Sequence, residues 1–129
     1  KCKPCPVHKM TAQDASFVKY GVNSFLATKV MWFNQFKELI DGNGSDYDTV
    51  ISAIGADERI NSSHTVVPGE DGRFGFGGAC FPKDTNAFSA FGSGTMSILD
   101  LVIKENNKIR SQYELDDREK EQKVVYNVS

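Results

Sequence analysis

The densest group of residues able to do chemistry lies at 74–84, with the sequence Phe-Gly-Phe-Gly-Gly-Ala-Cys-Phe-Pro-Lys-Asp. Its glycines permit positive φ angles and let backbone N–H groups approach a ligand closely. Asp84 suits the start of a helix, so we expect Cys80 near a helix N-terminus. That position and the neighbouring Lys83 favour the thiolate, which is the nucleophilic form. A glycine-rich turn with a buried, unreactive cysteine explains the same residues equally well.

A second candidate group is Lys19 and Asn23. Residues four apart share one face of a helix. An ammonium and an amide together can donate hydrogen bonds to an oxygen that gains negative charge during a reaction. The pattern alone favours the simpler interpretation, a polar pair that faces solvent.

A third group, near the N-terminus, resembles half of a zinc or redox site and contains Cys2, Cys5 and His8. Zinc needs four ligands, and a redox Cys-x-x-Cys motif usually opens a helix after a strand. The remaining donors, His64 and Cys80, are distant in sequence. We therefore expect no metal site.

The elements that must position these residues are helices. Thr11 is a suitable N-cap for a long helix that runs to about Ile40. The helical spacing is carried by a wide apolar stripe made of Val18, Val22, Phe25, Leu26, Phe33, Phe36, Leu39 and Ile40. Ser45 or Asp46 caps a second helix, which stops at Gly55.

Residues 55–82 are rich in Gly, Pro, Ser and Asn and have no helical or strand period. A loop of this length inside a compact domain is usually functional, and its aromatic residues argue against disorder. Helical patterns return near Asp84 and near Thr95. The run 104–123 is mostly charged and predicts a solvated surface or linker.

These patterns predict an all-α fold, in which a long central helix packs with shorter helices and a long glycine-rich loop. We expect that loop to lie across the long helix, so that Cys80 faces Lys19 and Asn23. Three parts follow along the chain. They are a lead-in (1–10), a helical domain (11–112) and a charged linker or tail (113–129).

The composition excludes several classes of partner. The chain has 129 residues and a formal net charge of −2, so it offers no basic surface for nucleic acid. No apolar run approaches the roughly 20 residues that a membrane span requires. Three cysteines do not predict a disulfide framework, and they favour a reducing, cytoplasmic compartment.

Three segments carry a resemblance to a known family. They are Lys-Tyr-Gly-Val-Asn-Ser-Phe-Leu-Ala-Thr-Lys-Val at 19–30, Ala-Asp-Glu-Arg-Ile at 56–60 and the cysteine segment at 75–84. In order and spacing they resemble signatures of the UDP-glucose/GDP-mannose dehydrogenase family over about residues 12–107. This resemblance implies the dimerisation domain of a larger α/β dehydrogenase, which oxidises the primary alcohol of a nucleotide sugar to a uronic acid with NAD.

The resemblance also implies roles for individual residues. Cys80 matches the nucleophile that forms a thioester, and Asp84 matches the carboxylate that helps to activate water. Lys19 and Asn23 match the pair that steadies an oxyanion and a catalytic water. The implied substrate-binding residues are Phe74, Gly75, Phe76, Gly77, Gly78, Lys83 and Arg59, of which Arg59 resembles an arginine that reaches the neighbouring subunit's sugar.

The chain departs from the family pattern in several places. No Gly-x-Gly-x-x-Gly unit follows a strand, so NAD binding is expected mainly in a domain outside this chain. The stretch 64–73 is longer than in common members, which blurs the alignment of Arg59. We expect the isolated chain to be inactive. The alternative is a non-catalytic dimerisation or scaffold module of the same family.

Overall fold

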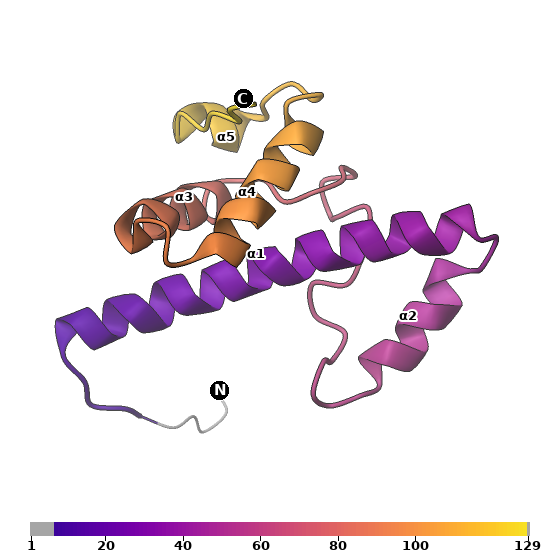
Figure 1. Cartoon of the computed structure of the whole chain (residues 1–129), viewed down its shortest axis with the longest axis horizontal. Helices are drawn as coiled ribbons and strands as arrows, with labels where there is room; N and C mark the ends of the chain where they lie inside the picture. The colour runs from indigo at the N-terminus through magenta and orange to yellow at the C-terminus, as the bar shows by residue number, and fades with distance from the viewer. Residues whose placement is uncertain (1–6, 129) are drawn as a thin grey trace.

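The computed structural model describes residues 7–128, and within them it contains five helices and no strand (Figure 1). The helices are α1 (Ala12–Gly42), α2 (Tyr47–Gly55), α3 (Phe81–Gly92), α4 (Ser97–Arg110) and α5 (Asp117–Glu121). The prediction of an all-α fold around one long helix is therefore confirmed. Cys2 and Cys5 lie outside the described residues, and His8 is exposed.

Capping side chains fix the start of the first two helices. The Thr11 hydroxyl accepts a hydrogen bond from the Asp14 backbone N–H at 3.0 Å, as predicted. Of the two caps considered for α2, the structure selects Asp46, whose carboxylate accepts from the Thr49 N–H at 3.0 Å. Each cap satisfies a backbone donor that a helix start leaves unpaired. The end of α1 lies at Gly42, two residues beyond the prediction.

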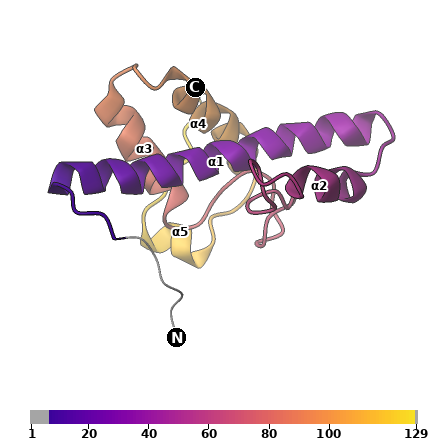
Figure 2. The same cartoon turned by 90° about the horizontal axis from the view of Figure 1, so that it is seen from below.

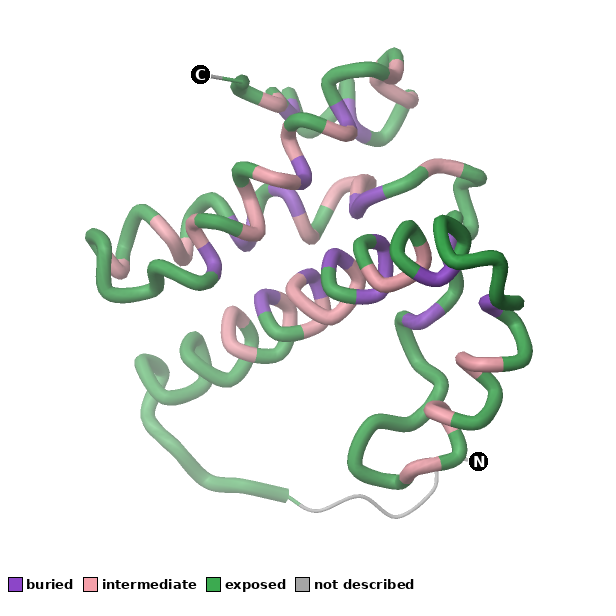
Figure 3. Tube along the Cα trace, turned by 45° about the vertical axis from the view of Figure 1, so that its right-hand side comes forward, coloured by how far each residue is buried: buried purple, intermediate pink, exposed green. Residues whose placement is uncertain are grey.

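Two apolar clusters form along α1, one toward each end of its buried length. Toward its C-terminal end, α2 folds back beside α1 (Figures 1 and 2). The cluster there is Phe33, Ile40, Tyr47 and Val67, with Phe36, Val50, Ile51 and Ile54 around it. The other cluster joins α1 to the loop, α3 and α4, and contains Ala27, Met31 and Phe76 with Val30, Phe81, Val102 and Ile109. The first turns of α1 are exposed (Figure 3).

The long segment between α2 and α3 is ordered by its contacts with the helices. The Tyr47 hydroxyl donates to the Thr65 carbonyl oxygen at 2.6 Å, which ties the segment to α2. Farther on, Phe76 is 4% exposed and packs with Ala27 and Met31 of α1. Burying such a side chain contributes about 2 kcal/mol. The glycine-rich part of the segment therefore lies against α1, as predicted.

The last two predicted helices begin at other residues than expected. α3 starts at Phe81 rather than near Asp84, because Pro82 is tolerated in the first turn, where its missing N–H has no helical partner. Cys80 thereby becomes the N-cap residue of α3. α4 starts at Ser97 rather than Thr95.

The prediction of a solvated charged run at 104–123 is wrong at three residues, one of which is the uncharged Asn106. Arg110 is 2% exposed and Glu119 is fully buried. Glu119 lies in α5, a short helix whose start is closed by reciprocal hydrogen bonds between Asp116 and Glu119. A charge count along the sequence misses this burial because the two charges neutralise each other in space rather than along the chain.

Candidate active site

Cys80 lies at the N-terminal end of α3 with its side chain exposed. Its carbonyl oxygen accepts the first helical hydrogen bond, from the Asp84 N–H at 2.8 Å. The backbone N–H groups of a helix's first turn have no partner within the helix and form the positive end of its dipole. Lys83, in that turn, is exposed. Cys80 therefore lies at the positive end of the α3 dipole, and its side chain makes no capping hydrogen bond there.

Asp84 connects α3 to α1. It is 4% exposed, and its Oδ2 accepts a hydrogen bond from Asn23 Nδ2 at 2.6 Å. This contact brings together two of the predicted catalytic residues, from positions 61 apart in sequence. The second N–H of the Asn23 amide and the second oxygen of Asp84 keep capacity for further hydrogen bonds. The pair can therefore orient a polar group beside the first turn of α3.

Lys19 lies one helical turn before Asn23 and makes no hydrogen bond or ion pair with any described residue. It is exposed, and its Nζ lies 5.4 Å from the centre of the Tyr20 ring. The structure therefore leaves the expected contact between Lys19 and the cysteine loop unmade, while the ammonium stays free to move.

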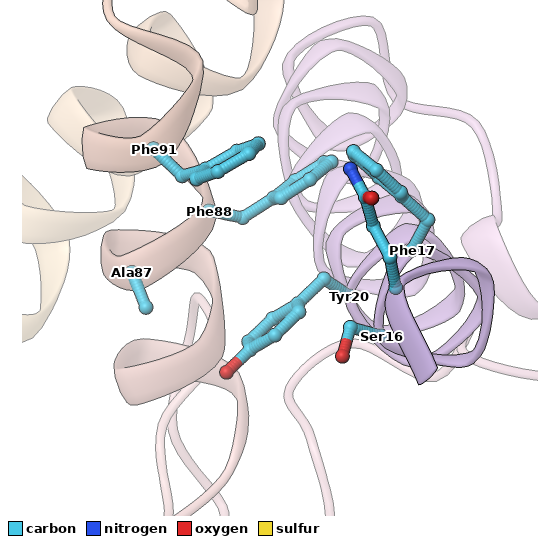
Figure 4. Close-up of a pocket in the computed structure, with 7 residues that line it drawn as sticks. Ser16, Phe17, Tyr20, Ala87, Phe88 and Phe91 are labelled. Atoms are coloured by element: carbon cyan, nitrogen blue, oxygen red, sulfur yellow. The ribbon is translucent and has the colours of Figure 1, made fainter. Parts of the chain in front are cut away.

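A cleft of about 430 Å³ opens between the first turns of α1 and the second half of α3 (Figure 4). In Figure 4 the rings of Phe17 and Tyr20 point across it toward Phe88 and Phe91. Tyr20 stacks on Phe88 with ring centres 6.0 Å apart. The lining consists of Gln13, Ser16, Phe17, Tyr20, Ala87, Phe88 and Phe91. None of these is a carboxylate, imidazole or thiol, and the polar side chains of the lining are those of Gln13, Ser16 and Tyr20.

The first half of the glycine-rich loop is held by asparagine side chains. The Gly75 N–H donates to Asn34 Oδ1 at 2.8 Å. Asn106 bonds both backbone groups of Phe76, with distances of 2.7 Å to its N–H and 2.9 Å to its carbonyl oxygen. Gly75 has φ +73° and no room for a Cβ, which would overlap Asn106 Oδ1. The protein's own packing therefore requires this glycine.

The second half of the loop contains one glycine that packs against buried side chains and one with free space around its Cα. A Cβ at Gly77 would lie 2.5 Å from Glu119 Oε1 and 2.7 Å from Arg110 Cζ. Gly78 has φ +81°, and a Cβ there would have no atom within 4 Å among the described residues. Of the predicted substrate residues at 74–78, Gly78 therefore presents an open backbone face, whereas Phe76 is in the core. Their roles toward a substrate stay predictions.

Gly77 offers a test of this packing. We expect Gly77→Ala to destabilise the chain by about 1–3 kcal/mol, because the added methyl overlaps a buried ion pair that has no room to move. The measurement is the free energy of unfolding in urea. The control is Gly42→Ala, whose methyl meets nothing within 4 Å and which should gain about 0.5 kcal/mol from better helix propensity. Equal effects of the two substitutions would contradict the packing argument.

The remaining predicted substrate residues, Phe74 and Arg59, have hydrogen-bond partners outside the first turn of α3. Phe74 is half-exposed, and its N–H is 3.3 Å from the Tyr113 hydroxyl oxygen, which accepts the bond. Arg59 is exposed and is held by Asp57, with bonds of 3.0 Å and 2.6 Å to the two carboxylate oxygens. The structure does not bring Arg59 into hydrogen-bonding contact with the residues around Cys80.

The longer stretch at 64–73 is tied to α4 through Asp71. Its Oδ2 accepts from Arg110 Nη1 at 2.8 Å, and its Oδ1 accepts from the Arg73 N–H at 3.0 Å. Burial raises the pKa of Asp71, but these hydrogen bonds and the charges of both arginines outweigh burial and leave the pKa lowered. Asp71 therefore stabilises the fold as an anion.

The lowered pKa of Asp71 predicts a pH dependence. Its stabilising contribution is complete above the unfolded-state pKa near 3.8 and is lost as the pH falls through the lower folded-state value. We expect Asp71→Asn to lower the melting temperature at neutral pH, and its difference from the parent to shrink below about pH 4. Thermal unfolding of both proteins between neutral and acidic pH measures this. A difference that is constant with pH would contradict it.

Four residues that shape the loop were not identified from the sequence: Asn34, Asn106, Arg110 and Glu119. A signal existed for the first three, because a polar residue at a helical position that continues an apolar stripe has to be buried. Asn106 and Arg110 continue the α4 stripe of Leu99, Val102 and Ile103. Glu119 gave no such signal, since its short helix has no apolar periodicity.

The fold and the site define a helical domain that presents a free thiol beside a glycine-rich loop and an Asp–Asn pair. Residues 13–108 match the model of the UDP-glucose/GDP-mannose dehydrogenase family, central domain. The chain belongs to this family, as its resemblance to the three signature segments predicted.

Similar proteins include two from Bacillus subtilis (strain 168). The UDP-glucose 6-dehydrogenase YwqF is 34% identical over 105 residues, which cover 79% of this chain and 23% of that protein. The UDP-glucose 6-dehydrogenase TuaD is 33% identical over 108 residues, covering 81% and 22%. The UDP-glucose 6-dehydrogenase AglM of Haloferax volcanii is 38% identical over 85 residues, covering 66% and 19%. The chain thus spans less than a quarter of the length of these relatives.

Proposed function

We propose that this chain is the cysteine-bearing central part of an NAD-dependent nucleotide-sugar 6-dehydrogenase. The observation that carries the proposal is the exposed thiol of Cys80 at the start of α3, one turn from the Asp84–Asn23 pair. The family and the names of the relatives support it, because the similar proteins are UDP-glucose 6-dehydrogenases. The reaction converts the sugar's primary alcohol to a carboxylate.

In the proposed chemistry the alcohol first loses a hydride and a proton and becomes an aldehyde. The Cys80 thiolate then adds to the aldehyde carbon, and the carbonyl electron pair moves to oxygen, where Lys19 and the Asn23 amide stabilise the negative charge. Loss of a second hydride from the same carbon gives a thioester. Water, oriented by Asp84, adds to the thioester, and the thiolate leaves as the acid forms.

The described residues contain no strand followed by a glycine turn and a helix, the unit that commonly binds a dinucleotide. We propose that NAD is bound mainly outside this chain; when bound, it accepts the two hydrides. This chain supplies the sulfur, the oxyanion donors and the water-orienting carboxylate.

The sugar nucleotide is proposed to lie along the open face of Gly78 and beside Phe74. Lys83, exposed in the first turn of α3, can pair with a phosphate as a point charge. Arg59 is exposed and bonds only its neighbour Asp57 among the described residues, which suits the proposal that it reaches a sugar bound to a neighbouring subunit.

A homodimer is part of the proposal, and the exposed face of α1 supports it. Large apolar side chains stand exposed there, including Phe25 at 68% and Trp32 at 56%. They recur at alternating spacings of four and three residues, as in a helix that pairs with another helix. The exposed apolar members of this series are Val18, Val22, Phe25, Trp32 and Leu39; Lys29 and Phe36, which packs against the Phe33 cluster, hold the two positions between them.

We expect Phe25→Glu to convert the dimer to a monomer, because it places a charge in the centre of this seam. Sedimentation velocity over a range of concentrations measures the change. Lys104→Glu, an exposed position on α4, is the control and should leave the dimer intact. A parent chain that is monomeric at high concentration would contradict the proposed homodimer.

A reducing, cytoplasmic location is also proposed, since the chemistry needs Cys80 as a free thiol. Within residues 7–128, no helix is both long and apolar enough to cross a membrane.

The function is tested with the complete protein encoded by the gene that carries this sequence. Purified protein is incubated with NAD and separately with UDP-glucose, GDP-mannose and a UDP-N-acetylhexosamine. The proposal expects two NADH and one uronic acid per molecule of one of these substrates. A protein that dimerises but forms neither product from any of them supports the alternative, a non-catalytic dimerisation module.

A further inference from the structure

Two buried, oppositely charged side chains hold the loop immediately before Cys80. Arg110, from the end of α4, is 2% exposed, and Glu119, from α5, is fully buried. Arg110 Nη1 lies 3.7 Å from Glu119 Oε1. Both residues follow the stretch 13–108 that matches the family's central domain.

The pair contacts the loop at three points. Arg110 donates to Asp71 Oδ2 at 2.8 Å and to the Gly75 carbonyl oxygen at 3.1 Å. Glu119 Oε1 accepts from the Gly78 N–H at 3.2 Å. Gly77 fits directly against both side chains, with no space for a Cβ. The loop is therefore fixed on its inner side up to the second residue before Cys80.

The carboxylate of Glu119 is itself held from several sides. Its Oε1 also accepts from the Tyr126 hydroxyl at 2.7 Å, and its Oε2 accepts from the Asp116 N–H at 3.0 Å. Arg73 Nη1 lies 3.9 Å from Oε2. A carboxylate with this many donors has little freedom, so the point at which it accepts from Gly78 is fixed.

Burying an ion pair is a poor way to gain stability, since well-packed apolar side chains of similar volume often do as well or better. A guanidinium–carboxylate pair instead fixes the orientation of the groups that bond to it, because the arginine's donors have a fixed planar geometry. Cys80 is anchored on its other side by the Asp84–Asn23 hydrogen bond. The thiol thus lies between two polar anchors, one on each side in sequence.

We infer that Arg110 and Glu119 are positioning residues, which set the place of the Gly78 peptide and so aim the Cys80 thiolate at the aldehyde carbon. This inference rests on the proposed function. A displaced thiolate attacks more slowly, and a shift of about 1 Å can cost on the order of 100-fold in rate. The first oxidation does not use sulfur, so displacement slows the second oxidation and lets the aldehyde escape.

The test uses the complete protein with NAD, the nucleotide sugar that it oxidises, and hydroxylamine to trap free aldehyde. Glu119→Ala should raise the ratio of trapped aldehyde to uronic acid about 10-fold or more. Glu119→Gln keeps an oxygen that accepts from Gly78 and should restore most of the parent ratio. Glu105→Ala, which removes a surface carboxylate on α4 paired with Lys108, is the control and should leave the ratio unchanged.

The ratio distinguishes positioning from simple loss of fold, because unfolded molecules make neither product. Both products falling together with an unchanged ratio would overturn the inference. Should Glu119→Ala fail to fold, Arg110→Lys replaces it. This variant keeps the charge but loses the fork that reaches both Asp71 and Gly75, and the same shift in ratio is expected.

A complete protein that oxidises no nucleotide sugar would refute the proposed function but not the loop contacts. In that case, hydrogen exchange of backbone amides tests whether Glu119 holds the loop in place. Glu119→Ala should speed exchange of backbone amides at 74–80 while amides of α1 keep the parent rate. Exchange that is unchanged at 74–80, or that rises throughout the chain, would overturn the inference.

Discussion

Replacing Cys80 with serine in the complete protein is expected to stop uronic acid formation while the first oxidation continues. The fall in acid formation should be on the order of 10³-fold or more, as for the loss of nucleophiles in other enzymes. The first hydride leaves an alcohol carbon that sulfur does not touch, whereas the second leaves a carbon that sulfur has already attacked. A serine hydroxyl is a far weaker acid than a thiol and gives almost no alkoxide at neutral pH, so it attacks poorly.

The experiment counts NADH and traps covalent adducts for mass spectrometry. The parent should carry a thioester on the peptide that contains Cys80, and Cys80→Ser should release aldehyde with about one NADH per substrate. Cys5→Ser removes a different thiol and is expected to behave like the parent. Uronic acid made by Cys80→Ser at the parent rate would show that the nucleophile is assigned to the wrong residue.

Lys19→Ala is expected to slow both oxidations together, by about 10²- to 10³-fold, the loss seen when one oxyanion donor is removed. Its effect differs from that of Cys80→Ser because negative charge develops on the substrate oxygen at several steps, not only when sulfur attacks. The exposed ammonium makes no hydrogen bond or ion pair in the described structure, so its loss should leave the melting temperature nearly unchanged.

Separate rates for the two oxidations, obtained by supplying alcohol or aldehyde, check this expectation. The control is Lys104→Ala, which removes an exposed lysine from α4 without touching the loop. A Lys19→Ala protein with both rates near the parent's would remove Lys19 from the site and leave Asn23 as the donor in this chain.

Local signals predicted most of the helical framework. Thr11 and Asp46 carry side chains that satisfy backbone donors at a helix start, and this chemistry is complete within three residues. The start of α3 was harder to predict, because a proline usually interrupts a helical pattern, yet Pro82 lies in the first turn, where proline is favoured. Apolar spacing likewise located α1, and its end at Gly42 lies within two residues of the predicted Ile40.

The sequence predicted the residues of the candidate site but not the side chains that hold its loop in place. Cys80, Asn23 and Asp84 were identified from short motifs, and the structure brings the last two into contact. The support of the loop comes from pairings such as Glu119 with Gly78, across 41 residues. No periodicity of a charged segment reveals such a pairing, because the partner that makes burial tolerable lies far away in the chain.

The position of Glu119 bears on how this unit can be exchanged between relatives. The helical unit matched by the family ends at residue 108, yet the side chains that complete the loop before Cys80 follow it, through Tyr126. A chimera joined at residue 108 would combine a loop from one parent with a foreign support. Its Gly77 would face side chains of another size, leaving either a void or an overlap. The smallest transplantable unit therefore extends about 18 residues beyond the family boundary, to Tyr126.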